Sequence, residues 1–272
     1  TMSNGLLEST GGTWKLNGDF NKTSGTLSIT ETDLTLTNNI TLTSDQDRSL
    51  NFETLNLNLY TLTLGSSTSD LTVQNAITID ASTEGISTGE ADLLLSALTL
   101  SAGDVTSTGG IVSLSGGGQL SGTGELNVSG STWGLGGDFV KSSGTLTMSQ
   151  TNLALSGNST LTSDEALSFV TLSLNDSKLT LGSSTSDLTV INAITIDAST
   201  EGISTGGADL VLMSALTMSE GLLQSSGGTW EFNGDFKKTG GTLSITDTDL
   251  TLTSSITLTS DDALIFSTLN LN

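Results

Sequence analysis

Apolar and polar residues alternate along short stretches of this chain from one end to the other. In Asp33–Asp45, leucine and isoleucine alternate with threonine on both sides of an Asn-Asn pair. Strict alternation places the apolar side chains on one face of a β-strand and the polar side chains on the other. The same pattern recurs in Gly25–Thr30, Leu59–Leu64, Leu93–Leu100 and Gly144–Met148. These stretches predict β-strands with one buried face, and no stretch has the periodicity of a helix.

The predicted strands recur at intervals of about 20 residues along the chain. A coil that winds repeatedly requires such regular recurrence, whereas a sandwich of two sheets does not. Each turn of a coil can bury its apolar face only against its neighbours, so the stacked turns share one core. The sequence therefore predicts an all-β fold, a parallel β-helix (β-solenoid) with about 20 residues per turn and about 14 turns.

The chain also contains long internal repeats. Thr1–Asp45 matches Thr217–Asp261 at 35 of 45 positions, and Ser66–Leu95 matches Ser183–Leu212 at 27 of 30 positions. Self-similarity at a fixed period indicates a repeat architecture. We interpret residues 1–272 as one continuous β-solenoid, taken from a longer repeat array. Its half-units cover approximately residues 1–119, 120–216 and, incompletely, 217–272.

A tryptophan marks each half-unit, at Trp14, Trp133 and Trp230. Trp14 and Trp230 lie in alternating strand context, which favours a place in the core over an exposed contact patch. One half-unit is longer than the other by a piece close to Ile111–Gly130, which leaves its flanks intact. An insertion of about 20 residues predicts that one whole turn was added. On this count the repeat comprises about 11 turns, in half-units of about six and about five.

The composition restricts the chemistry that the chain can perform. It has no histidine, cysteine or proline, and its 29 acidic and 7 basic residues give a net charge of -22. Histidine and cysteine are the commonest acid–base and nucleophilic residues, so we expect no enzymatic activity. The negative charge disfavours nucleic-acid binding, because phosphates would be repelled. No basic amphipathic segment is present, so we expect no membrane contact in this segment.

Leucine–threonine repeats such as Thr35–Thr43 and Ala91–Ser101 occur in a chain rich in Thr, Ser, Gly and Asn. In these features the chain resembles the β-helical repeat regions of large bacterial surface and secreted proteins. Filamentous-haemagglutinin-like adhesins, autotransporter passengers and giant repetitive matrix proteins belong to this class. The resemblance implies an extracellular or cell-surface stalk or fibre. We also expect the chains to associate end to end or laterally, because the edge strands of a solenoid invite pairing.

The structural role is also suggested by repetition at positions that we expect on the surface. Asp70 recurs as Asp187, and Glu84 recurs as Glu201. A surface that repeats in this way is typical of a stalk whose length is its function. The fold itself requires no cofactor.

One alternative is an adhesin module that binds a glycan or Ca²⁺ on its side face. Glu31 and Asp33 are two residues apart, as are Asp247 and Asp249. Residues two apart on a strand share a face at about 6.6–7 Å, so each pair could converge on a Ca²⁺ ion. The middle copy of the repeat has uncharged amides at these positions, so the fold does not require charge there.

The other alternative is a polysaccharide-active β-helix enzyme. Asp261 and Asp262 would be its carboxylate pair, but the other half-units do not reproduce two aspartates there. We interpret both residues instead as solvated turn residues. The aspartates of the recurring Gly-Asp-Phe triplet, Asp19, Asp138 and Asp235, are likewise interpreted as turn residues rather than ligands.

Overall fold

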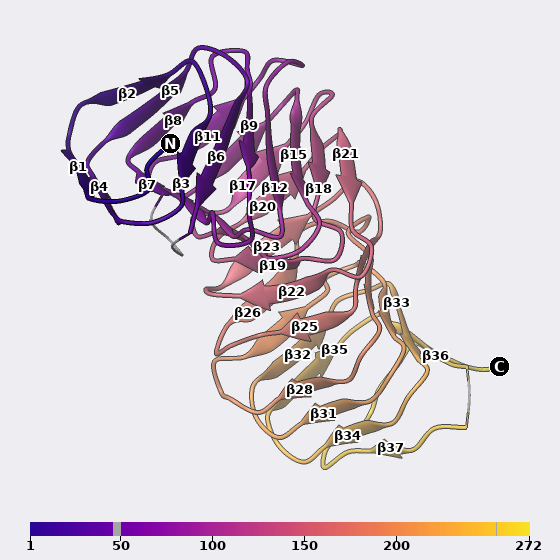
Figure 1. The fold of residues 1–272 in the computed structure, drawn as a ribbon. Helices are drawn as coiled ribbons and strands as arrows, with labels where there is room; N and C mark the ends of the chain where they lie inside the picture. Colours follow the sequence, from indigo (N-terminus) through magenta and orange to yellow (C-terminus); the bar gives the residue numbers. More distant parts are fainter. Residues whose placement is uncertain (46–49, 254) are drawn as a thin grey trace. The chain divides into compact units, whose positions relative to one another are not determined.

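The computed structural model describes residues 1–45, 50–253 and 255–272, and their strands are short and parallel (Figure 1). The chain is an all-β parallel β-solenoid of about 13 turns, with bridges about 20 residues apart. This confirms the fold class and the turn length predicted from the sequence, with one turn fewer. Within these ranges, no helix is long and apolar enough to cross a membrane.

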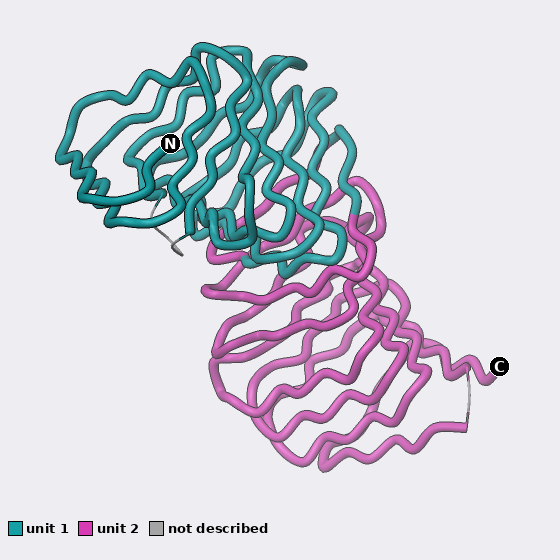
Figure 2. Tube along the Cα trace, viewed as in Figure 1, with its two compact units in different colours: residues 1–134, 143–147 teal, residues 135–142, 148–272 magenta. Residues whose placement is uncertain are grey.

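The structure divides into two compact units (Figure 2). Unit 1 comprises residues 1–134 and 143–147, and unit 2 comprises residues 135–142 and 148–272. Strand β19 (Thr132–Leu135) crosses the boundary. In both units a strand generally pairs with the strand three places further along the chain, so three strands make one turn.

The described residues of unit 1 form five runs of hydrogen-bonded parallel strands. The first three runs are β1 (Leu6–Thr10) and β4 (Thr26–Thr30); β2 (Thr13–Leu16), β5 (Asp33–Leu36) and β8 (Thr54–Asn56); and β11 (Ile77–Ile79), β14 (Leu98–Leu100) and β17 (Gly118–Leu120). The fourth run is β7 (Leu50–Phe52), β10 (Leu71–Val73), β13 (Leu93–Leu95) and β16 (Ile111–Leu114). The fifth run is β3 (Phe20–Lys22), β6 (Ile40–Ser44), β9 (Thr61–Leu64), β12 (Gly85–Gly89), β15 (Asp104–Ser107), β18 (Glu125–Asn127) and β21 (Thr145–Thr147).

In the part of unit 2 that the structure describes, there are four such runs. The first two are β22 (Asn152–Leu155) and β25 (Thr171–Ser173); and β28 (Ile194–Ile196), β31 (Leu216–Met218), β34 (Phe236–Lys238) and β37 (Leu258–Thr259). The third is β20 (Phe139–Lys141), β23 (Ser159–Thr162), β26 (Lys178–Leu181), β29 (Gly202–Ser204), β32 (Leu222–Ser225) and β35 (Thr242–Ile245). The fourth is β24 (Leu167–Phe169), β27 (Leu188–Val190), β30 (Leu210–Leu212), β33 (Thr229–Phe232), β36 (Asp249–Leu252) and β38 (Thr268–Leu271).

The core of each unit consists of like apolar side chains stacked turn upon turn. In β10, Leu71 and Val73 are buried, while Thr72 between them points outward. Leu71 pairs with Leu50 of the previous turn and with Leu93 of the next. Burying such a side chain fully is worth about 1.5–3 kcal/mol, so neighbouring turns stabilise one another. The alternation predicted from the sequence is confirmed here.

The inserted piece is one complete turn. Ile111–Gly130 contains strands β16, β17 and β18, and these three strands visit each side of the coil once. The prediction that a whole turn was added is therefore confirmed.

The half-units are not whole numbers of turns. Trp14 lies in β2 and Trp133 in β19, 17 strands later, which at three strands per turn is one strand short of six turns. In unit 1 the two tryptophans accordingly lie in different sheets, because β2 pairs with β5 whereas β19 adjoins β16. In unit 2, Lys141 in β20 and Lys238 in β34 are 14 strands apart, one strand short of five turns. Each half-unit is thus one strand short of a whole number of turns, close to the lengths of about six and about five turns expected from the sequence.

Two of the three tryptophans are fully buried. Trp133 and Trp230 are 0% and 1% exposed, which confirms their predicted place in the core. Trp14 is half-buried, and its ring lies 5.9 Å from Phe20 and 5.8 Å from Phe52. Its predicted burial is therefore only partly confirmed.

The aspartates of the Gly-Asp-Phe triplets connect successive turns. Asp19, Asp138 and Asp235 each accept a hydrogen bond of 2.7 Å from a backbone N–H one turn further along. Backbone donors at the corners of a coil have no strand partner, and a carboxylate satisfies them. The interpretation of these aspartates as turn residues is confirmed.

We expect Asp138→Ala to lower the free energy of unfolding by about 0.5–1.5 kcal/mol, because the N–H of Thr160 loses its acceptor. Both groups are accessible to water, which limits the loss. Asp138→Asn keeps an oxygen acceptor and should retain most of the stability. Urea denaturation followed by circular dichroism measures both variants, and an equal loss in both would show that charge matters rather than the hydrogen bond.

Candidate functional site

The most distinctive chemistry in the molecule is a set of three buried lysines. The side chains of Lys22, Lys141 and Lys238 are 0%, 3% and 1% exposed. Lysine is almost never fully buried without a partner, because removing an ammonium group from water is costly. We call each lysine with its carboxylate partners a lysine cluster. The three clusters are Lys22 with Asp45, Lys141 with Asp164 and Glu165, and Lys238 with Asp261 and Asp262.

Strand alternation places each lysine in the core. Lys141 is the last residue of β20 and lies two residues after the buried Phe139, so both side chains point inward. Val140 pairs with Thr162 of the next turn, which brings Asp164 to the corner next to the lysine. Nζ of Lys141 contacts Asp164 and lies 3.2 Å from Oε1 of Glu165. The ammonium group is thus buried, while its two partners remain about half exposed.

The carboxylates keep two of the buried lysines, Lys141 and Lys238, charged. Burial lowers the pKa of Lys141, but hydrogen bonds to Asp164 and Glu165, together with their charges, outweigh burial and raise that pKa above its ordinary value. The hydrogen bond from Lys141 in turn lowers the pKa of Asp164. The pKa of Lys238 is raised and that of Asp261 lowered for the same reasons. The clusters of Lys141 and Lys238 are therefore ion pairs at neutral pH.

The interpretation of Asp261 and Asp262 as solvated turn residues is confirmed, because both lie in a bend and about half of each side chain is exposed, but no partner was predicted for them. Their carboxylates lie 2.6 Å and 2.7 Å from Nζ of the buried Lys238. Their side chains are partly exposed, but they neutralise a cation in the core. A signal for this was present in the sequence, because lysine and aspartate recur together at the spacings of the tryptophans.

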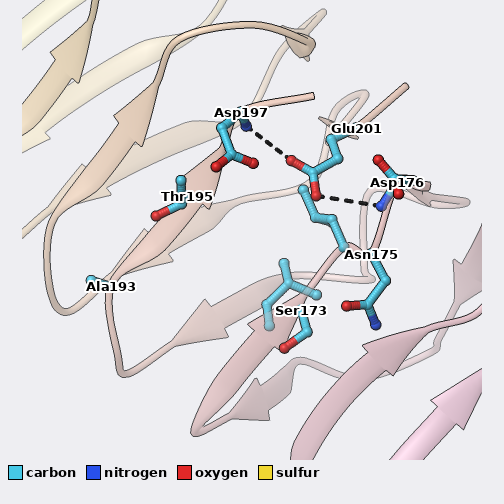
Figure 3. A pocket seen from close by; sticks show the side chains of 9 residues that line it. Ser173, Asn175, Asp176, Ala193, Thr195, Asp197 and Glu201 are labelled. Carbon is cyan, nitrogen blue, oxygen red and sulfur yellow. Dashed lines mark hydrogen bonds between the residues drawn. The ribbon is translucent and has the colours of Figure 1, made fainter. Parts of the chain in front are cut away.

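A second recurring device is a buried glutamate that holds two turns together. Glu201 is 8% exposed, and its Oε2 accepts a hydrogen bond of 2.9 Å from the N–H of Asp197. Its Oε1 faces the N–H of Asp176 on the preceding turn at 3.4 Å, as Figure 3 shows. Glu84 makes the equivalent contacts in unit 1, with the N–H groups of Leu59 and Asp80. The expectation that Glu84 and Glu201 lie on the surface is therefore wrong.

Beside Glu201 lies an open recess of about 460 Å³. Asn175, Asp176, Thr195 and Asp197 line it together with Glu201 (Figure 3). Asn175 and Asp176 have φ of 48° and 61°, the left-handed conformation of a tight turn. Because both oxygens of Glu201 already face backbone N–H groups, this carboxylate serves the turn.

A third group of polar side chains lies in the run of unit 1 that extends from β3 to β21. Asp104 and Glu125 are directly opposite each other on β15 and β18, beside a recess of about 380 Å³. Burial and the neighbouring charge of Glu125 raise the pKa of Asp104. Glu125 belongs to the inserted turn, so the insertion created this pair of like charges.

We expect Asp104→Asn to stabilise the protein at pH 7 by about 0.2–1 kcal/mol, because it removes a like-charge pair on adjacent strands. A carboxyl group whose pKa is raised on folding opposes folding above its ordinary pKa of 3.8. This opposition disappears as the pH falls through the raised pKa. The gain should therefore vanish near pH 3 in thermal melts, and Glu125→Gln should behave alike. The same gain at both pH values would contradict the account.

The structure places the predicted calcium ligands at turns rather than along single strands. Glu31 and Asp247 each have a φ of 50° and precede the strand, whereas Asp33 and Asp249 begin β5 and β36. The premise that each pair shares the face of one strand is therefore wrong. In the described ranges, no three Asp, Glu, His or Cys residues are grouped so that they could hold a metal ion. Calcium binding stays a prediction.

Asp33 instead has a structural partner. Its Oδ1 accepts a hydrogen bond from the hydroxyl of Thr54 on the next turn. Asn152 accepts the equivalent bond from Thr171 at 2.8 Å. An amide oxygen performs this role as well as a carboxylate does, which explains why the middle copy needs no charge here.

The fold and these polar contacts define the protein as a β-solenoid whose successive turns are joined by recurring side-chain contacts. No protein-family model, curated protein or solved structure gives a match to the chain. Its class therefore rests on the fold alone.

Proposed function

We propose that the chain is a structural segment of an extracellular stalk or fibre, and that the length of the stack is its function. The observation that carries the proposal is the engagement of the polar side chains. The buried lysines, the glutamates Glu84 and Glu201 and the Gly-Asp-Phe aspartates all bond one turn to the next. These charged side chains are thus occupied in holding the coil together.

The physics of a solenoid supports this role. Each added turn contributes its own stability and its interface with the previous turn, so length can grow without a new fold. The inserted turn of unit 1 is an instance of such growth. We further propose a location at the cell surface or outside the cell, and self-association end to end or laterally, as for the bacterial proteins that the sequence resembles.

Removal of the inserted turn tests whether the number of turns can change without loss of the fold. Deleting Ile111–Gly130 would place Trp133 against Leu93. In unit 2 the equivalent leucine, Leu210, already pairs with Trp230 without an intervening turn. We therefore expect the shortened chain to fold, with the same circular dichroism per residue and a melting temperature within about 5 °C of the parent.

A matched control is the deletion of residues 111–120, which removes about half a turn and puts strands out of phase with their sheets. This variant should not fold cooperatively. A shortened chain lacking the whole turn that is equally unfolded would contradict the proposal. A melting temperature that rises with calcium, or binding on a glycan array, would favour the adhesin alternative.

A further inference from the structure

The lysine clusters differ from the apolar stacking contacts in how often they occur. Apolar stacking repeats on each turn, whereas a buried lysine occurs once per half-unit. In unit 2, Lys141 lies in the sheet that runs from β20 to β35, and Lys238 lies in the sheet that runs from β28 to β37. Because the half-units are not whole numbers of turns, these two clusters belong to different sheets.

Apolar stacking alone cannot fix which turn pairs with which. Along the sheet that holds Lys141, the inward positions include Leu161, Leu179 and Ile203, which are chemically interchangeable. If β23 looped out, for example, Phe139 would meet Leu181 in place of Leu161, which is the same type of contact. Register is weakly specified wherever neighbouring strands offer equivalent partners.

A shift of one turn would separate Lys141 from its carboxylates. The observed register of β23 with β26 places Ser183 one turn beyond Ser163. A shifted Lys141 would therefore face Ser184 and Thr185 in place of Asp164 and Glu165. Its ammonium group would be buried without a carboxylate, and no second cluster in that sheet could replace the lost partners.

We propose that the lysine clusters set the register of the turns, so that one stacking of nearly equivalent turns is selected over its shifted alternatives. The clusters act mainly by destabilising the shifted pairings of strands, in which a lysine would be buried without a carboxylate. A buried ion pair often contributes little net stability over an apolar pair of similar volume, but it can specify register. The role of the clusters is therefore separable from stability by experiment.

The test compares register with stability in the same protein. The chain has no cysteine, so Val140→Cys with Thr162→Cys introduces a reporter pair across β20 and β23. Adjacent strands are about 4.8 Å apart, a distance that a disulfide spans. Oxidation of the reporter protein should give nearly complete intramolecular cross-linking, measured by peptide mass spectrometry after digestion.

Adding Lys141→Met to the reporter should lower the cross-linked fraction by about twofold or more, with hydrogen exchange showing more than one population. The urea midpoint should hardly change. Lys178→Met is the matched control, because Lys178 is exposed on the same sheet, and it should leave cross-linking complete.

Two results would overturn the proposal. Complete cross-linking in the Lys141→Met protein would show that the lysine does not select the register. A large fall in the urea midpoint with a single population would show that it only stabilises. Lys238→Met with the reporter Lys237→Cys and Thr259→Cys repeats the test on the other sheet, should the first variant fail to fold.

Discussion

Trp230→Ala is expected to lower the free energy of unfolding by about 3–5 kcal/mol, because it leaves a cavity in a closely packed core. Trp230 is fully buried, and its ring lies 6.0 Å from Phe232 and 6.1 Å from Phe266. Its indole N–H also donates to the hydroxyl of Thr205 at 3.3 Å. Denaturation in guanidinium, followed by far-ultraviolet circular dichroism, measures the loss.

Trp14→Ala is the matched comparison, because Trp14 occupies the same repeat position but is half-buried. It should lose only about 1–2 kcal/mol, since less apolar surface returns to water. Equal losses at the two positions would mean that burial by the neighbouring turn does not determine the energetics of the repeat.

The second large effect is expected from removing the partners of a buried lysine. Asp164→Asn with Glu165→Gln leaves the ammonium of Lys141 buried without a carboxylate. Breaking a buried pair in this way costs about 3–5 kcal/mol, and the partial exposure of both carboxylates reduces the expected loss to about 2–3 kcal/mol. Urea denaturation at pH 7 measures it, with Lys141→Met as the comparison, which should change stability by less than about 1 kcal/mol.

The contribution of the Lys141 cluster to the stability of the protein depends on pH in both the acid and the alkaline range. Asp164 has a lowered pKa, so its contribution is present above the ordinary value of 3.8 and is lost as the pH falls through the lowered value. Lys141 has a raised pKa, so its contribution is present below 10.5 and is lost as the pH rises through the raised value. The difference between the double variant and the parent should therefore be greatest between these limits. A difference that stays constant from pH 2 to pH 12 would contradict the ion pair.

The fold could be predicted because apolar alternation reports burial directly. Leu34 and Leu36 are both fully buried, as their period of two predicts, and their recurrence about 20 residues apart identifies the coil. The sheet in which each half-unit begins could not be predicted. Turns differ in length by a few residues at their corners, so a residue count does not distinguish six turns from one strand fewer.

The lysine clusters are difficult to predict because lysine is usually exposed, and only its position in the alternation places it inward. Lys22 follows Phe20 at a spacing of two, so the alternation alone places its side chain inward. Its partner Asp45 is 23 residues away, and pairing over that distance depends on the register of the coil. The burial of Glu84 is equally difficult to predict, because its partners are backbone N–H groups that a sequence does not display.

The central claim, that the chain is part of an extracellular stalk or fibre, is tested most directly by immunogold electron microscopy of the native source. Antibodies raised against this chain should label filaments or surface projections, outside the cell and along their length. Label confined to compact particles, with no filament or projection at the surface, would contradict the account.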